Sequence, residues 1–517
     1  MSFTLSDLTS GSFTTSLSGT RGIATQFSGG NGILYNSVNS GANWTLRITV
    51  VDVNFSSIAL SGLNGIAGGI NTTSNSPVIY WTADGGVNWT ATASSLGSTI
   101  NTIIVSISGT KAIAGLTTNG APSDCSAYYS GDGGVTWAVG FTLATGTSES
   151  INNVVIDGST AIVTTFEGVN SVLRNSTDAG ATWNIRLTLS FTLQVKISLS
   201  GANAIYCGQS GANGVIQYSS DNGTTWSIPT TTPGLPSNLP RAVSISGSVG
   251  IIGGVNGTTG FIWYTSDGGN TWTNSNPIIP SITSVLNYAS ISASGVNSLA
   301  AINTTTGGTG YLYYSTNSGQ SWTLSNSLAS TTINNAVLSG SNAIAGTSAG
   351  IYYTSSPLCY EANTLILTVE NEEEVYKKVS ELKVGDLVKT YKQGYKKINL
   401  LRSFSYKPLD KNNELNLLYK HKENGVILTA GHSILVDELT EQEKINNKKY
   451  RFSQTIEDKK LLLACSSDKF EKIDDDQEYH LYHFSLESDE PKAHFGVYIN
   501  DGLLSESCSE EALLRMF

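Results

Sequence analysis

Thr82-Ala83-Asp84-Gly85-Gly86-Val87-Asn88-Trp89 is one copy of an octapeptide that occurs seven times in residues 1–358. We call this octapeptide the tryptophan turn; its pattern is Ser/Thr-x-Asp/Asn-x-Gly-x-Thr/Asn/Ser-Trp. Successive tryptophans lie 45, 48, 46, 43, 46 and 50 residues apart. A period of this length is typical of one four-stranded blade of a β-propeller. The sequence therefore predicts an all-β propeller over residues 1–358.

The positions that recur in each tryptophan turn have separate structural roles. The acidic or amide side chain can bind nearby backbone N–H groups, the glycine supplies a positive φ, and the tryptophan starts the next strand and can bury its ring. We assign structural roles to the polar positions Asn39, Asp84, Asp132, Asp178, Asp221, Asp267 and Asn317, and to Trp44, Trp89, Trp137, Trp183, Trp226, Trp272 and Trp322. The repeat resembles the Asp-box (BNR) repeat of sialidase-like and sortilin-like propellers, where these turns lie away from the catalytic face.

The number of blades follows from a second repeated element, in which a strand, Ser-Gly and a small apolar strand precede each turn. We count eight such elements but only seven tryptophan turns. The segment Ser2–Ser6 reads like Ser321–Ser325, the strand that follows the seventh turn. We therefore predict that residues 2–6 pair with the strand near residues 351–355 and close an eight-bladed ring, which removes exposed sheet edges. The alternative is a seven-bladed ring with a stray segment.

Composition changes abruptly between Leu358 and Cys359. Residues 1–358 hold 7 of the 29 Lys+Arg and 11 of the 40 Asp+Glu, and the rest follow. Neither part has a basic face, which argues against nucleic-acid binding. No stretch approaches the roughly 18 apolar residues of a membrane span, and the first residues lack a secretory signal. We expect a cytoplasmic or virion-associated protein without a membrane span, and the scattered cysteines give no reason to expect a metal or cofactor.

Four short stretches mark the second domain, which we place at residues 359–517. Cys359 precedes a strand, a Gly-Asp turn follows at residues 385–386, a Thr-x-x-His turn joins Thr429 to His432, and His483 lies in a late strand. In this order and spacing they resemble the Hint module of hedgehog autoprocessing domains and inteins, over residues 359 to about 507. The resemblance implies an all-β horseshoe with pseudo-two-fold symmetry.

The same resemblance implies a reaction at the bond between Leu358 and Cys359. A cysteine thiol is a good nucleophile near neutral pH, and as the first residue it lies beside the carbonyl that it attacks. Attack by Cys359 produces a thioester at Leu358. The resemblance makes His432 the general acid and gives Thr429 an orienting hydrogen bond, whereas His483 is either a base acting on Cys359 or a plain surface histidine.

The end of the module departs from the splicing pattern of inteins. Where splicing needs an asparagine, this chain has Glu506 and Ser507 before Cys508. Splicing is therefore not expected, and Glu506→Ala should have little effect on cleavage. The tail after Cys508 is too short for a sterol-binding appendage, so water or another nucleophile should resolve the thioester.

These features favour a self-processing precursor that releases a propeller acting as a binding or structural module, with an unidentified protein or glycan ligand. One alternative is a structural or adhesion protein whose Hint domain is inactive. The other is a sialidase-like glycosidase. The propeller has five arginines, no histidine and few carboxylates outside the turns, which is a poor set for that chemistry.

Overall fold

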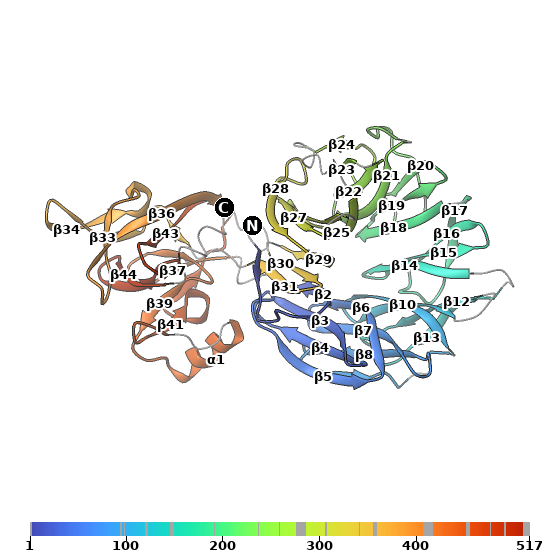
Figure 1. The fold of residues 1–517 in the computed structure, drawn as a ribbon, viewed down its shortest axis with the longest axis horizontal. Helices are drawn as coiled ribbons and strands as arrows, with labels where there is room; N and C mark the ends of the chain where they lie inside the picture. The colour runs from blue at the N-terminus through green and yellow to red at the C-terminus, as the bar shows by residue number, and fades with distance from the viewer. Residues whose placement is uncertain are drawn as a thin grey trace. The chain divides into compact units, whose positions relative to one another are not determined.

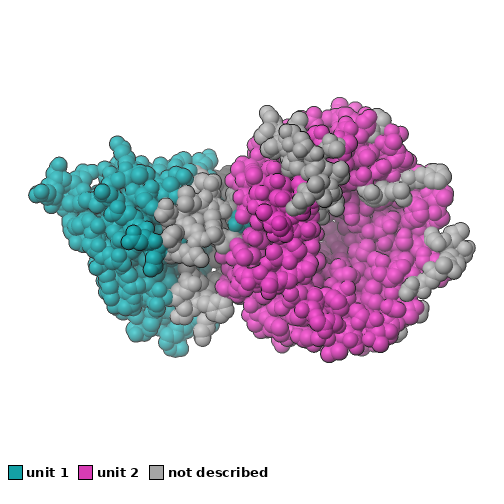
Figure 2. All heavy atoms as spheres, in the orientation of Figure 1, with its two compact units in different colours: residues 1–4, 355–517 teal, residues 5–354 magenta. Residues whose placement is uncertain are grey.

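The computed structural model describes residues 3–509 except 94–95, 98, 119–122, 145–148, 191, 236, 258, 276–285, 305–307, 341, 355–358, 407–416, 451–454, 476 and 491–492. Two compact units make up the chain: residues 5–354, and residues 355–517 grouped with residues 1–4 (Figure 2). Within the described ranges, no helix is long and apolar enough to cross a membrane.

Residues 5–354, together with the strand that begins at Phe3, form eight antiparallel sheets in the described part of the chain, each forming one blade (Figure 1). The first strands are β2 (Phe13–Ser18), β6 (Val53–Ser61), β10 (Ile100–Ser108), β14 (Glu149–Asp157), β18 (Thr192–Ser200), β21 (Leu239–Ser246), β25 (Leu286–Ser294) and β29 (Ile333–Ser339). The second strands are β3 (Arg21–Ser28), β7 (Asn64–Asn71), β11 (Lys111–Thr118), β15 (Thr160–Glu167), β19 (Asn203–Ser210), β22 (Val249–Asn256), β26 (Asn297–Thr304) and β30 (Asn342–Thr347).

The outer half of each blade holds a third strand and usually a fourth. The third strands are β4 (Asn31–Ser37), β8 (Pro77–Thr82), β12 (Cys125–Ser130), β16 (Asn170–Ser176), β20 (Asn213–Ser219), β23 (Thr259–Thr265), β27 (Gly310–Ser315) and β31 (Gly350–Thr354). The fourth strands are β5 (Thr45–Val51), β9 (Thr90–Ala91), β13 (Ala138–Leu143), β17 (Asn184–Ser190), β24 (Thr273–Asn274), β28 (Thr323–Leu328) and β1 (Phe3–Leu5). In the fifth blade, a bridge between Tyr218 and Ser227 stands in place of a fourth strand.

The ring closes in the blade that contains both ends of the propeller sequence. Its strand order is β1-β31-β30-β29, and β29 packs beside β2 of the first blade. Beyond β1, Ser6 N donates to Ile351 O at 2.8 Å, and Ile351 N donates to Leu8 O at 3.1 Å. Phe3 is buried, as a blade strand requires. The eight-bladed prediction is confirmed, and the seven-bladed alternative is wrong.

The repeated Ser-Gly pairs connect neighbouring blades. Each glycine begins a two-residue hairpin between the first and second strands with φ between 56° and 63°, as the first position of a type II′ turn requires. Its N–H donates at 2.7–3.0 Å to a side-chain oxygen of the preceding blade. The donor–acceptor pairs are Gly62–Ser18, Gly109–Ser61, Gly158–Ser108, Gly201–Asp157, Gly247–Ser200, Gly295–Ser246, Gly340–Ser294 and Gly19–Ser339. These bonds form a complete circle, with the pair Gly19–Ser339 spanning the closure.

The polar side chain at the third position organises each tryptophan turn. Ser176 Oγ donates to Asp178 Oδ1 at 2.7 Å, while Thr182 donates its N–H (2.9 Å) and its hydroxyl (2.6 Å) to the same carboxylate. The Thr182 hydroxyl and backbone bonds lower the pKa of Asp178 to about 2. Equivalent bonds surround Asp84, Asp132, Asp221 and Asp267. In the two amide versions, Asn39 and Asn317 instead donate to Asn43 Oδ1 and Ser321 Oγ.

The glycine and tryptophan of each turn pack between two blades. Gly134 has φ 94°, and a Cβ there would lie 2.7 Å from Ile66 Cγ2 of the preceding blade, so only glycine fits. Trp137 Nε1 donates to Gly134 O at 3.0 Å. Burial of the rings is uneven: Trp44, Trp272 and Trp322 are buried, whereas Trp89, Trp137, Trp183 and Trp226 are half-buried.

We predict that Trp272→Ala lowers the free energy of unfolding of the propeller by about 3–5 kcal/mol, the range for a buried tryptophan. Trp272 is 3% exposed, packs in one cluster with Ile205 and Trp263, and donates to Gly269 O at 2.9 Å. All nine tryptophans lie between positions 44 and 322. Denaturant unfolding followed by tryptophan fluorescence therefore reports on this unit within the full chain.

Trp137→Ala is the matched control, because its half-buried ring loses less contact on truncation. Its midpoint should fall between those of the parent and the Trp272 variant. A Trp272 variant as stable as the parent would contradict the assigned packing.

The second unit is built on one antiparallel sheet, with 14 strands in its described residues. Along the sheet these are β40 (Thr455–Ile456), β41 (Lys459–Leu463), β39 (Ser433–Val436), β45 (Leu503–Glu506), β44 (Gly496–Ile499), β33 (Leu365–Glu370), β35 (Leu387–Lys389), β36 (Tyr395–Tyr406), β43 (Tyr479–Leu486), β32 (Tyr360–Glu361), β38 (Ile427–Thr429), β37 (Leu418–His421) and β42 (Phe470–Lys472), with β34 (Glu373–Lys378) paired to β33. Short 3₁₀ helices cover Val379–Glu381 and Ala464–Ser466.

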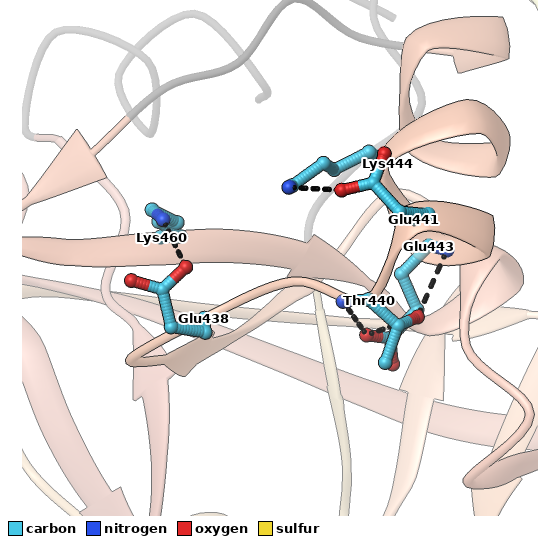
Figure 3. Close-up of polar contacts among 6 residues, drawn as sticks. All are labelled: Glu438, Thr440, Glu441, Glu443, Lys444 and Lys460. Atoms are coloured by element: carbon cyan, nitrogen blue, oxygen red, sulfur yellow. Dashed lines mark hydrogen bonds and ion pairs between the residues drawn. The ribbon is translucent and has the colours of Figure 1, made fainter.

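One α-helix, α1 (Glu441–Tyr450), interrupts the strands of this unit in its described part. Thr440 caps it: Glu443 N donates to Thr440 Oγ1 at 3.2 Å, and Thr440 N donates to Glu443 Oε2 at 2.9 Å (Figure 3). This reciprocal pair is a capping box. Asn447 then anchors the helix to β41 through Leu461 O (2.7 Å) and Leu463 N (3.1 Å).

Candidate functional site

Three neighbouring strands of the second unit bring three of the predicted site residues into one row. The short strand β32 lies between β43 and β38, with Tyr360 opposite both Tyr482 and Leu428. Continuing this register by one residue places Cys359 between Thr429 and His483. Directly opposite residues of antiparallel strands are near neighbours, so the row follows from strand pairing alone.

Cys359 is fully buried and its backbone is held by Thr429. Cys359 N donates to Thr429 Oγ1 at 2.9 Å, and Thr429 N donates to Cys359 O at 3.2 Å. That nitrogen belongs to the peptide bond with Leu358, which lies outside the described residues. Burial raises the pKa of the Cys359 thiol well above its usual value, and the nearby Cys508 thiol raises it further. The thiol therefore keeps its proton at neutral pH until a base removes it.

His432 lies at the end of the turn that follows β38 and is also fully buried. Its N–H donates to Thr429 O at 2.9 Å, which closes the turn. Its Nε2 lies 3.1 Å from Glu506 O, and its ring centroid is 4.3 Å from that of Tyr360. The turn thus places the imidazole beside the residue whose hydroxyl holds Cys359 N.

His483 is 1% exposed on β43, so the alternative of a plain surface histidine is wrong. Its ring centroid lies 5.4 Å from that of His432 and 5.8 Å from that of Tyr360. Neither ring nitrogen has a hydrogen-bond partner within the described part of the chain. Burial lowers the pKa of His483 well below its usual value, with His432 and His494 lowering it further. The ring is therefore neutral at neutral pH.

Three further residues, which the sequence analysis did not assign to the site, complete the cluster. Tyr360 Oη donates to Glu506 O at 2.7 Å, and Cys508 N donates to Phe484 O at 3.2 Å, on the same strand as His483. Burial raises the pKa of the Cys508 thiol to about 12, and the Glu506 carboxylate contributes. The adjacency of Tyr360 to Cys359 was the available signal, but Glu506 and Cys508 lie at and just after the end of β45, far away in the sequence.

The other three histidines are not at the paired positions of the row, although His494 is close enough to His483 to lower its pKa. His421 is buried edge-on against Phe470, and His480 is exposed on β43. His494 Nδ1 lies 2.9 Å from Ser507 O. In the described ranges, no group of three His, Cys, Asp or Glu side chains could hold a metal ion.

The arrangement combines a nucleophile, a neutral base and a donor around one peptide bond. The thiol of Cys359 is covalently placed next to the carbonyl of Leu358, and His483 stands at the opposite strand position. Thr429 binds the nitrogen that would become the leaving amine. Such a set can move an acyl group from nitrogen to sulfur.

The arginines of the propeller do not gather at one site. They are Arg21, Arg47, Arg174, Arg186 and Arg241, and they lie in the first, fourth and sixth blades. Arg47 and Arg186 each use Nε to bind an asparagine of the same blade, at 2.6 and 2.7 Å, and Arg174 pairs with Glu167. This placement gives the glycosidase alternative no support.

No known family model matches the chain. No curated protein matches it either. Solved structures similar to it include Ycf48 bound to a D1 peptide (16% identity, 59% of this chain and 94% of that chain, TM-score 0.41) and Ycf48 from Cyanidioschyzon merolae (16%, 59% and 96%, 0.41). A GH74 enzyme from Niastella koreensis is 14% identical over 81% of this chain and 70% of that chain, with a TM-score of 0.36. Likenesses this distant carry no argument about activity or ligand.

Proposed function

We propose that the chain is a self-processing precursor in which Cys359 cleaves the peptide bond to Leu358 and releases the β-propeller. The observation that carries this proposal is the hydrogen bond from Cys359 N to Thr429 Oγ1, because that nitrogen is the leaving group of the reaction. The resemblance of residues 359–507 to a Hint module agrees with it and remains a prediction.

The reaction begins at a thiol that burial keeps protonated. His483 removes the proton, and Cys359 Sγ attacks the carbonyl carbon of Leu358. The new carbon–sulfur bond gives a tetrahedral centre, and the carbon–nitrogen bond breaks as the proton lost by the thiol is passed on to Cys359 N through His432. The resulting thioester then takes up water or another nucleophile. Hydrolysis leaves a carboxylate at Leu358 and restores the Cys359 thiol.

The released part is proposed to work as a binding or structural module, with a protein or a glycan as its ligand. Its acidic side chains are mostly engaged in tryptophan turns, and its arginines are dispersed. An inert second domain is the competing interpretation, in which the same contacts serve only stability.

Purified protein should separate into two fragments, one ending at Leu358 and one beginning at Cys359. Hydroxylamine or dithiothreitol should accelerate the separation, because each attacks a thioester and not a peptide bond. Intact-mass spectrometry over time gives both the fragment ends and the rate.

If the protein remains uncleaved with both reagents, the result would favour the interpretation that the second domain is inert. Cleavage at another bond would overturn the assignment of Cys359. Matched incubations without reagent measure spontaneous hydrolysis of the thioester and so distinguish it from attack by hydroxylamine or dithiothreitol.

A further inference from the structure

Glu506, the last residue of β45, holds the turn that carries His432 through two different groups. Its carbonyl oxygen lies 3.1 Å from His432 Nε2, and its Oε1 accepts from Ser433 N at 3.0 Å. Tyr360 Oη donates to the same carbonyl at 2.7 Å. Glu506 is fully buried, and its strand pairs with β39 through Ser505 and Ile434. One residue therefore binds two consecutive residues of the catalytic turn.

The carbonyl contact decides which tautomer of His432 is present. A carbonyl oxygen can only accept, so the hydrogen between the two atoms belongs to Nε2. In the neutral ring the lone pair is then on Nδ1. That nitrogen is the one that can take up a proton and pass it to the leaving amine. The Tyr360 ring, tilted by 53° against the imidazole, limits rotation of His432.

We propose that Glu506 is a positioning residue for cleavage: it holds His432 as the Nε2–H tautomer so that Nδ1 handles the proton of the leaving amine. This inference rests on the proposed function. The carboxylate matters because its bond to Ser433 N keeps the end of β45, and thus the carbonyl, against the turn. This inference differs from the sequence-based expectation that Glu506→Ala has little effect, and the experiment below decides between them.

The first test compares cleavage rates of full-length Glu506→Ala, Glu506→Gln and the parent. Loss of positioning by about 1 Å can cost about 10²-fold, so Glu506→Ala should be slower by roughly 10- to 100-fold. Glu506→Gln keeps an oxygen that accepts from Ser433 N and should cleave within about threefold of the parent, since it retains this acceptor. Thr368→Ala is the control, because it loses a buried hydroxyl bond to Val375 O (3.0 Å) without touching Tyr360, His432 or Glu506. It should cleave like the parent.

A second readout separates this inference from the proposed function. In Cys359→Ala protein with ¹⁵N-labelled histidine, ring nitrogen shifts of His432 should report a protonated Nε2 and an unprotonated Nδ1. Glu506→Ala in that background should mix the two tautomers, and Glu506→Gln should not. Unchanged tautomer populations or a parent-like cleavage rate in Glu506→Ala would overturn the inference. Absence of cleavage in the parent would overturn the proposed function, and the shifts would still reveal whether Glu506 sets the tautomer.

Discussion

Cys359→Ala should leave the chain uncleaved, with no detectable fragment at the time when the parent is fully processed. The substitution removes the sulfur atom that forms the thioester, and no other residue is tethered beside the Leu358 carbonyl. It should disturb the fold little, because alanine fits the small buried site among Leu418 and Leu481. Intact-mass spectrometry of both proteins under one set of conditions measures the effect.

Cys465→Ala is the matched control for the loss of a thiol. Cys465 belongs to the same unit, but its N–H binds Ala430 O and it lies outside the row of Cys359. It should be processed at the parent rate. Cleavage of Cys359→Ala at the Leu358 bond with an unchanged rate would reject the mechanism, whatever the fold of the second unit.

His432→Ala should slow cleavage by about 10²–10⁴-fold, the usual contribution of a positioned acid or base. The leaving amine needs a proton, and the turn Thr429–His432 brings the imidazole next to the threonine that binds Cys359 N. Without it, water must supply the proton. Slow residual cleavage, accelerated by hydroxylamine, is the expected behaviour, because the nucleophile remains. Fragment accumulation followed over days measures the rate.

His480→Ala controls for the loss of a histidine from the same unit. His480 is exposed on β43, three positions before His483, and bonds weakly to Ser405 Oγ at 3.4 Å. Its replacement should leave the rate unchanged. Equal slowing by both substitutions would indicate a general loss of stability instead of a lost proton donor.

The propeller could be predicted from sequence because its signal is repeated. Seven tryptophan turns fixed the period, and the mismatch with eight Ser-Gly elements pointed to a blade completed by the N-terminal strand. The hydrogen bonds that the Ser-Gly pairs make between neighbouring blades could not be predicted in this way. Ser339 and Gly19 are partners only because the ring closes, and their separation in sequence carries no local pattern. The uneven burial of the tryptophans was also not predictable, since it depends on the neighbouring blade.

The candidate site was predictable where chemistry restricts residue type. Cys359, Thr429 and His432 each belong to a short motif, and strand pairing brings them together. The identity of Glu506 gave no such signal, because its decisive group is a backbone carbonyl that any residue possesses. Its proposed role rests on the pairing of β45 with β39, which joins residues more than 70 positions apart.

The closing blade also determines how the propeller carries mechanical load. Seven blades are continuous in sequence, whereas the eighth joins β1 to β31 without a covalent link, through hydrogen bonds and the buried Phe3. Tension applied between the N-terminus and residue 354 therefore falls first on this one seam and on the bond between Gly19 and Ser339. The other blades are loaded only after the seam opens. The force at which the ring opens is therefore set by the contacts of the closing blade and not by the number of blades.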